Sequence, residues 1–159
     1  MDKLKTIASE SYSTVNSPVQ YAAVKAYTDD LSDYKNNVIK ILNYVGNYVY
    51  RSLKSNKVLI NPPEGGFYLM PEFLNSKFKN SSQMCDKILS DTGVALLPGS
   101  DFGFKPSRMI VRLSYTDFDG TEILNKVSKG DSLNIEVLKK HAPNVVEGVK
   151  KLSNWAKNL

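Results

Sequence analysis

Cysteine, histidine and tryptophan each occur only once in this chain of 159 residues. The single cysteine, Cys85, excludes an intrachain disulfide and favours a reducing compartment. The single histidine, His141, follows two lysines and precedes Ala-Pro, which is typical of a solvent-facing helix end rather than of a base or a ligand. Because histidines and cysteines do not cluster, the sequence indicates no metal site.

Long apolar runs are also missing. The first residues, Met-Asp-Lys-Leu-Lys-Thr-Ile, lack the apolar core of a signal peptide, and no run approaches the length that spans a bilayer. We therefore expect a soluble, cytoplasmic protein without a membrane partner. The length of 159 residues is that of one domain, which can bury a core without disulfides or metals.

Neither sign of charge is concentrated in a block. The 21 basic residues are spread among 16 acidic ones, which gives a net charge of +5. The lysines fall where predicted helices face water, and aromatic residues do not alternate with them as they do on RNA-recognition surfaces. We therefore expect no nucleic-acid partner. A basic nucleic-acid binder remains the weakest of the three functions considered for this chain, the other two of which are given below. The affinity of such a binder for DNA or RNA would fall steeply as the salt concentration rises.

The chain does contain signals for helices around a few short strands. The N-terminal part carries weak helix signals, a polar loop over 9–17 and a second helix that Ser17 caps. Apolar residues at three- and four-residue spacing then predict a long amphipathic helix over 30–54. Gly46 lies inside this helix, so either a neighbour packs close to it or the helix is locally weak.

The remaining residues predict a small sheet and its covering helices. Ser81 or Ser82 caps the next helix, which Gly93 ends, and Asp119 caps a later one. We expect strands at 58–60, 67–70, 94–97 and 109–115, and helices at 119–127, 131–141 and from 143 onward. The element order predicts a mixed α/β (α+β) fold, with a small, mainly antiparallel sheet covered by helices and preceded by the long helix.

The strand predicted over 109–115 carries one charged residue inside an apolar run. Alternation places Arg112 on one face with Ile110 and Ser114, neither of which is charged. A guanidinium is unfavourable there unless a planar anion meets it, and its donor fork fits a carboxylate at two points. The alternative is an arginine on a half-solvated sheet edge.

This stretch resembles the C-terminal part of fold-type I, class I/II pyridoxal-phosphate-dependent aminotransferases. Those enzymes share a Pro-Gly-Ser-x-Phe-Gly turn, here 98–103, and a following strand with Arg-Leu-Ser-Tyr, here 112–115. Three further segments occur in the family's order, at 8–15, 17–24 and 63–71. The resemblance corresponds to roughly the last two-fifths of such an enzyme.

The resemblance implies a transaminase activity to which this chain contributes only some of the residues. By resemblance, Arg112 binds the α-carboxylate of an amino acid or a 2-oxo acid, and Phe102 lines the pocket. The parent enzyme would be a homodimer that uses pyridoxal 5'-phosphate. Neither Lys3 nor Lys5 is flanked by the small residues that accompany the family's cofactor lysine. We therefore expect this chain alone to bind no cofactor and to lack transaminase activity.

The resemblance also divides the chain. Residues 1–27 would pack on the large cofactor-binding domain, and 28–159 would form the small domain, including the connecting helix 30–54. Without the large domain, we expect 1–27 to be disordered, rearranged or used in a non-native dimer, since their apolar face needs covering. A second alternative is a non-catalytic interaction module or one half of a split enzyme.

Overall fold

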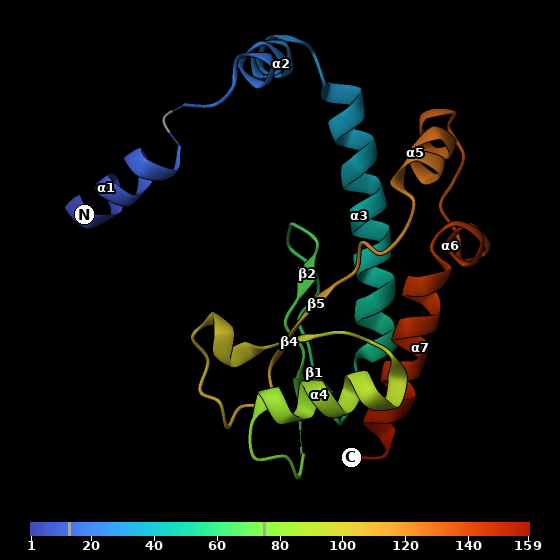
Figure 1. Ribbon diagram of the computed structural model, residues 1–159. Helices are drawn as coiled ribbons and strands as arrows, with labels where there is room; N and C mark the ends of the chain where they lie inside the picture. The colour runs from blue at the N-terminus through green and yellow to red at the C-terminus, as the bar shows by residue number, and fades with distance from the viewer. Residues whose placement is uncertain (13, 75) are drawn as a thin grey trace. The chain divides into compact units, whose positions relative to one another are not determined.

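A computed structural model describes residues 1–12, 14–74 and 76–159 of the chain. The chain divides into two compact units, residues 1–35 and residues 36–159. Helix α3 (Ser32–Leu53) begins in the first unit and continues through the second (Figure 1). It corresponds to the long amphipathic helix predicted over 30–54.

The first unit consists of two helices and the start of α3. Helix α1 spans Asp2–Ser11 and helix α2 spans Ser17–Thr28. The loop between them is shorter than the predicted 9–17, and Ser13 of that loop lies outside the described residues. Asn16 rather than Ser17 caps α2, because its side-chain oxygen accepts a hydrogen bond from the Val19 amide at 3.1 Å.

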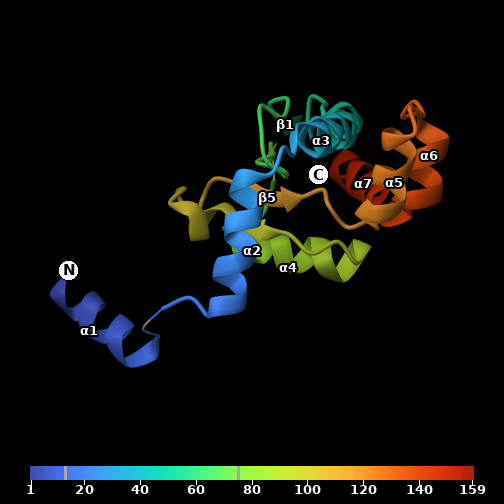
Figure 2. The same cartoon turned by 90° about the horizontal axis from the view of Figure 1, so that it is seen from above.

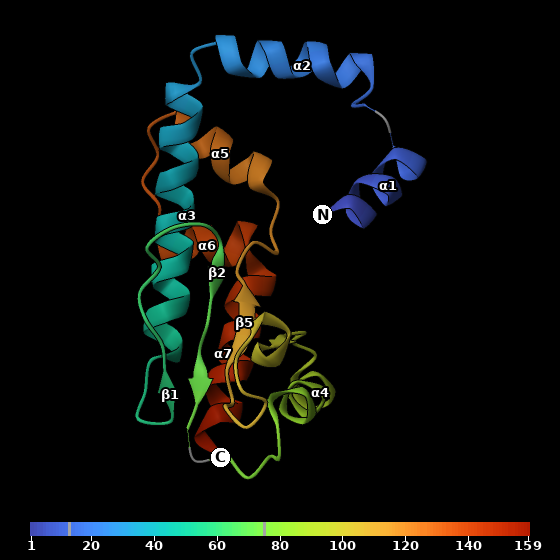
Figure 3. The same ribbon diagram turned by 90° about the vertical axis from the view of Figure 1, so that its left-hand side faces the viewer.

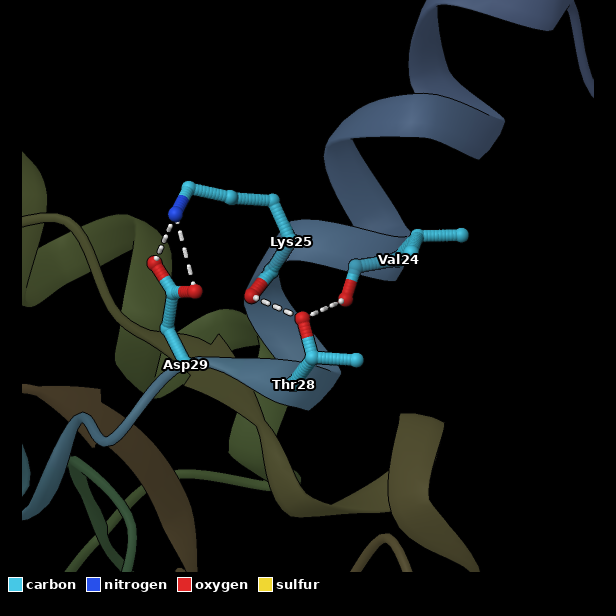
Figure 4. Close-up of polar contacts among 4 residues, drawn as sticks. All are labelled: Val24, Lys25, Thr28 and Asp29. Carbon is cyan, nitrogen blue, oxygen red and sulfur yellow. Dashed lines mark hydrogen bonds and ion pairs between the residues drawn. The ribbon is translucent and has the colours of Figure 1, made fainter.

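Local contacts close the C-terminal end of α2 (Figure 4). The Lys25 Nζ atom lies 2.9 and 2.7 Å from the two carboxylate oxygens of Asp29, and the Thr28 hydroxyl donates to the Val24 carbonyl at 2.9 Å. Each bond joins residues four apart, so it stabilises the helix end without tying it to another element. No residue of α1 or α2 is buried.

The second unit contains two small antiparallel sheets. Strands β1 (Val58–Leu59) and β3 (Glu72–Phe73) form one, and β5 (Val111–Ser114) lies between β2 (Tyr68–Leu69) and β4 (Leu97–Pro98) in the other. Figure 3 shows β2 and β5 side by side, running in opposite directions. A bridge between Glu72 and Ile110 connects the two sheets. The predicted class, a mixed α/β fold with a small, mainly antiparallel sheet, is confirmed, although the strands divide between two sheets instead of forming one.

Two details of the strand prediction are wrong. Strand β3 was not expected, and the strand expected over 94–97 is reduced to Leu97–Pro98. Val94 lies against helix α7 (Pro143–Lys157) instead of joining the sheet, since its Cγ2 atom is 3.6 Å from the position that a Cβ would take on Gly148.

Helices pack against the sheets and against one another. Besides α3 and α7, the second unit contains α4 (Ser81–Thr92), the short 3-10 helix η1 (Gly99–Phe102), α5 (Gly120–Ser128) and α6 (Ile135–His141). Helix α7 contacts both α4 and α6 (Figures 1 and 2). Their buried apolar side chains form a core with α3 and β5, which includes Val45, Val49, Ile88, Val111 and Leu152.

Most helix ends follow the sequence signals. Gly93 ends α4 with a φ of 74°, and Asp119 caps α5 by accepting from the Thr121 amide at 2.9 Å, both as predicted. The N-terminal cap of α4 differs from the prediction of Ser81 or Ser82. Instead, the Asn80 side chain caps this helix by accepting a hydrogen bond from the Gln83 amide at 2.8 Å. His141 ends α6 as predicted, but it is partly buried rather than exposed.

Gly46 resolves the choice that the sequence left open. A Cβ on Gly46 would lie 2.9 Å from Cζ and 3.0 Å from the hydroxyl of Tyr115, so a neighbour does pack close to α3. Tyr115 is 2% exposed, and its hydroxyl donates to the Gly66 carbonyl at 2.9 Å. Burial raises the pKa of this phenol. Tyr115 therefore fixes the residues that follow β5 between α3 and the loop before β2.

Candidate functional site

Arg112 lies on the central strand of the three-stranded sheet, not on an edge. Leu97 of β4 pairs directly with Arg112, and Tyr68 of β2 pairs with Ser114. Paired residues and alternate residues share a face, so these four side chains lie on the same face of the sheet. Val111 and Leu113 point to the other face, where both are buried. The alternative interpretation placed Arg112 on a half-solvated sheet edge. The face that carries Arg112 is indeed partly solvated, but its strand is central and not an edge.

The Pro-Gly-Ser-x-Phe-Gly turn brings Phe102 to the same face. The Gly99 amide donates to the Ile110 carbonyl at 2.8 Å, and a Cβ on Gly99 would lie 2.8 Å from that oxygen, so only glycine allows this approach. Gly103 ends η1 with a φ of 85°, a conformation that glycine adopts without strain. The turn therefore folds closely against β5 and carries Phe102 back toward Arg112.

The Arg112 guanidinium contacts two aromatic rings. Its Cζ atom lies 4.3 Å from the centroid of the Phe102 ring and 4.4 Å from the centroid of the Tyr68 ring. As residues, Phe102 and Tyr68 are 40% and 41% exposed, and Arg112 itself is partly buried. A guanidinium over a ring face gains a cation–π attraction, and every one of its N–H donors stays free for another partner.

Arg108, four residues earlier, has an anionic partner within the chain. Its Nε and one terminal nitrogen donate to the two carboxylate oxygens of Glu72, at 2.9 and 2.5 Å. These hydrogen bonds lower the pKa of Glu72, against the opposing effect of partial burial. The donor fork of Arg108 is therefore used to join β3 to the segment before β5.

Arg112 has no such partner among the residues that the structure describes, because none of their carboxylates forms an ion pair with it. The two arginines thus differ in whether their guanidinium donors already have an anionic partner. Arg108 is neutralised internally, whereas Arg112 is held by rings that satisfy none of its donors. The arrangement at Arg112 can bind an external planar anion, and a carboxylate fits it at two points.

The side chains at Arg112 are partly exposed to solvent. Among the described residues of the second unit, three of the pockets have volumes of about 450, 670 and 290 Å³. Neither Arg112 nor Phe102 lines any of the three. The smallest is formed by the loop before β2 and includes Tyr68, so it borders the Arg112 surface. A small ligand at Arg112 would therefore stay largely exposed on this chain alone.

The residues around Arg112 do not form a complete pyridoxal-phosphate site. That cofactor needs an amine for its aldehyde, an acid for its ring nitrogen and donors for its phosphate. The groups placed at Arg112 are two rings and one guanidinium, which supply neither the amine nor the acid. Within the described ranges, no three His, Cys, Asp or Glu side chains group as a metal site. None of the described helices combines the length and apolar character of a membrane span.

Two features of this site were not identified from the sequence. Tyr68 was assigned to a strand, but its place beside Arg112 depends on the β2–β5 register, and the sequence does not fix that register. The Arg108–Glu72 pair joins residues 36 positions apart and gives no local pattern. Arg112 and Phe102, which were named from the sequence, are brought together.

Comparisons with known proteins agree with this architecture. The sequence profile of aminotransferase class I and II matches residues 1–126. An aspartate aminotransferase of Thermotoga maritima is 36% identical over 109 residues, which are 69% of this chain and 26% of that enzyme. Another, from Sulfolobus acidocaldarius, is 29% identical over 71% of this chain and 29% of its own length. This chain thus spans less than a third of the curated relatives it matches.

Solved structures show the same relationship. An alanine aminotransferase from Pyrococcus furiosus superposes with a TM-score of 0.66 and 23% identity, over 91% of this chain and 30% of that one, which shows the fold. The T. maritima aspartate aminotransferase structure gives a TM-score of 0.56 and 29% identity, over 79% of this chain and 31% of that one. On the profile match over residues 1–126, with which the shared fold agrees, the chain belongs to the class I and II aminotransferases.

Proposed function

We propose that this chain supplies the carboxylate-binding arginine of an aminotransferase, which transfers an amino group between an amino acid and a 2-oxo acid. The observation that supports this role is the difference between the two arginines near β5. Glu72 occupies the donor fork of Arg108, whereas the fork of Arg112 is free between two rings. Phe102 both contacts the guanidinium and borders the place where the substrate would lie.

The role of Arg112 in the reaction is to bind and to orient. A carboxylate held by two parallel N–H···O bonds cannot rotate about a single contact, so the adjacent Cα–H bond keeps a fixed direction. This orientation favours proton removal by a base that approaches from one side. The base and the pyridoxal 5'-phosphate that would accept the amino group belong, in this proposal, to the large domain of the parent enzyme.

The proposal assigns no transaminase activity to this chain alone. The groups placed at Arg112 are two rings and a guanidinium, which supply neither the amine nor the acid that the cofactor requires. The purified chain, mixed with one equivalent of pyridoxal 5'-phosphate and dialysed, is expected to retain no stoichiometric cofactor absorbance and to transfer no amino group. Retention of one cofactor per chain would overturn this part of the proposal.

Residues 1–27 are assigned to the surface that packs on the large domain. In support, α1 and α2 bury no residue, and their large apolar side chains are exposed, including Leu4, Ile7, Tyr21, Val24 and Tyr27. Residues 28–159 form the small domain. The parent enzyme would be a cytoplasmic homodimer.

Pyruvate titration tests the role of Arg112, because pyruvate is a 2-oxo acid with a single carboxylate. The matched variants are Arg112→Lys and Arg108→Lys, which keep the charge and remove the planar fork. We expect Arg112→Lys to raise the dissociation constant of pyruvate about tenfold, and Arg108→Lys to change it little. Methyl pyruvate, which lacks the carboxylate, should not bind. Equal effects of the two lysine variants would contradict the assignment.

A second candidate is an interaction module, or half of a split enzyme, that docks through its first two helices. The exposed apolar side chains of α1 and α2 favour it, since such side chains usually meet a partner. The reading frame before Met1 discriminates between the candidates. A continuous or adjacent frame that encodes the cofactor domain supports the enzyme, and unrelated sequence behind a stop codon supports the module.

A further inference from the structure

Tyr68 lies beside the candidate carboxylate site without belonging to the turn that carries Phe102. We propose that Tyr68 is a positioning residue for Arg112: its ring and the ring of Phe102 hold the guanidinium in the orientation that presents its donor fork to a carboxylate. This inference rests on the proposed function of Arg112 and extends it to the neighbouring strand.

The sheet register explains how Tyr68 reaches Arg112. Tyr68 pairs with Ser114, so Arg112 is its diagonal neighbour on the same face of the sheet. Diagonal neighbours on adjacent strands are within reach when one is aromatic and the other is long. The distance of 4.4 Å from the Arg112 Cζ atom to the Tyr68 ring centroid shows that this contact is made.

The two rings come from opposite sides of β5. Tyr68 belongs to β2, which flanks β5 on one side, and Phe102 follows β4, which flanks it on the other. Both lie at nearly the same distance from the guanidinium carbon, 4.4 and 4.3 Å. Arg112 is therefore bounded by an aromatic side chain from each neighbouring strand or its extension.

Ring contacts suit an arginine that must bind an external anion. All five N–H donors of a guanidinium lie in its plane, so a ring that covers its face consumes none of them. A carboxylate in the place of a ring, like Glu72 beside Arg108, would occupy the fork and exclude the substrate. Two rings instead restrict the long, flexible side chain and leave the fork available. Loss of one ring should weaken carboxylate binding although the charge remains.

The Tyr68 hydroxyl offers a competing explanation, because it could itself donate a hydrogen bond to the carboxylate. Two substitutions separate these roles. Tyr68→Phe keeps the ring and removes the hydroxyl, whereas Tyr68→Leu removes both. A matched control is Phe104→Leu, because the Phe104 ring lies 5.9 Å from the guanidinium carbon of Arg108 rather than that of Arg112.

The full chain, labelled with ¹⁵N-arginine, provides the readout. Its arginines are Arg51, Arg108 and Arg112, so three Nε–Hε signals are expected, and each is assigned by its own lysine substitution. Protons above a ring face are shielded, so the Arg112 Hε signal should move toward the position of an unstacked arginine in Tyr68→Leu and stay in Tyr68→Phe. Phe104→Leu should leave it unchanged. This selective shift reports the ring contact itself, and pyruvate affinity then tests whether the contact positions the guanidinium.

Pyruvate binding is measured on the same samples. We expect Tyr68→Leu to raise the dissociation constant about two- to fivefold, the range that an exposed cation–π contact implies, while Tyr68→Phe and Phe104→Leu match the unsubstituted chain. If Tyr68→Leu does not fold, Tyr68→Met replaces it, because methionine also removes the ring from the Arg112 guanidinium.

Each outcome decides the inference. If Arg112→Lys loses pyruvate but Tyr68→Leu binds it normally, Arg112 keeps its function and Tyr68 loses the positioning role. If Tyr68→Phe weakens binding as much as Tyr68→Leu, the hydroxyl and not the ring is responsible, which also overturns the inference. If Arg112→Lys binds pyruvate normally, the proposed function fails, and the Hε shift alone then reports the ring contact.

Discussion

Glu72 accepts two hydrogen bonds from Arg108 and thereby connects β3 to the segment that enters β5. Its side chain is 17% exposed, so the pair is partly shielded from water on the carboxylate side. The contact therefore joins the segment before β5 to the neighbouring sheet. Its contribution to stability should therefore depend on the charge of Glu72.

The pH dependence of stability follows from the direction of the pKa shift. Hydrogen bonds from Arg108, helped by its charge, lower the pKa of Glu72 in the folded chain below the ordinary value of 4.5. A lowered folded pKa gives stability that is present above pH 4.5 and is lost as the pH falls through the folded value. Urea unfolding at several pH values checks this. Glu72→Gln should be less stable than the unsubstituted chain at pH 7, and the difference should shrink below about pH 4.

Gly46→Ala should destabilise the second unit, although alanine is the better helix former. The added Cβ would lie 2.9 Å from the Tyr115 ring and 3.0 Å from Pro63, and the buried ring is fixed by its bond to Gly66. Overpacking of this kind costs about 1–3 kcal/mol, which exceeds the gain of about 1 kcal/mol from helix propensity. Chemical denaturation should therefore give a net loss of about 1 kcal/mol.

Gly148→Ala is the matched control for that experiment. Gly148 also lies inside a helix, α7, but its added Cβ would meet only Val94, at an ordinary contact distance of 3.6 Å. The helix-propensity gain then stands alone, so stability should rise by up to about 1 kcal/mol. A stabilising effect at both glycines would show that Tyr115 yields easily and that the Gly46 contact is not tight.

Cys85 should be unreactive in the folded chain. It is 6% exposed, and burial, followed by the nearby charges of Asp86 and Asp101, raises the pKa of its thiol to about 11. The thiolate that alkylating reagents attack is therefore scarce at pH 8. Iodoacetamide labelling at pH 8, followed by mass spectrometry, should be slow without urea and fast in denaturing urea. Equally fast labelling under both conditions would contradict the packing of α4.

Amide exchange should distinguish the first two helices from the core. Helices α1 and α2 bury no residue, so their hydrogen bonds open by local unfolding alone. Val111 and Leu113 of β5 are 0% and 4% exposed and belong to the central strand of a sheet. Hydrogen–deuterium exchange should therefore be much faster in residues 1–27 than in β5. Comparable protection in both regions would mean that α1 and α2 are covered in solution.

The sequence predicted those parts of the fold that depend on local patterns. The three- and four-residue spacing identified α3, and glycine at 93 and aspartate at 119 marked helix ends, because each signal lies within a few residues of its effect. Position 94 shows the limit. Val94 has the β-branched side chain of a strand, but it packs against α7, and only the tertiary arrangement decides between these places.

In the candidate site, too, some residues could be predicted from the sequence and others depend on tertiary contacts. Alternation and the resemblance both point to Arg112, whereas the resemblance alone points to Phe102. Tyr68 and Glu72 could not be identified, because one depends on the register between β2 and β5 and the other on a contact across 36 residues. Neither relationship leaves a periodic trace in a single sequence.

The most direct test of the account is to observe which arginine meets a carboxylate. Pyruvate is added to the full chain labelled with ¹⁵N-arginine, and the Nε–Hε signals of Arg51, Arg108 and Arg112 are followed. We expect the Arg112 signal to shift and saturate while the other two stay in place, and methyl pyruvate to move none of them. A shift at Arg51 or Arg108 instead, or no shift at Arg112 at saturating pyruvate, would contradict this expectation.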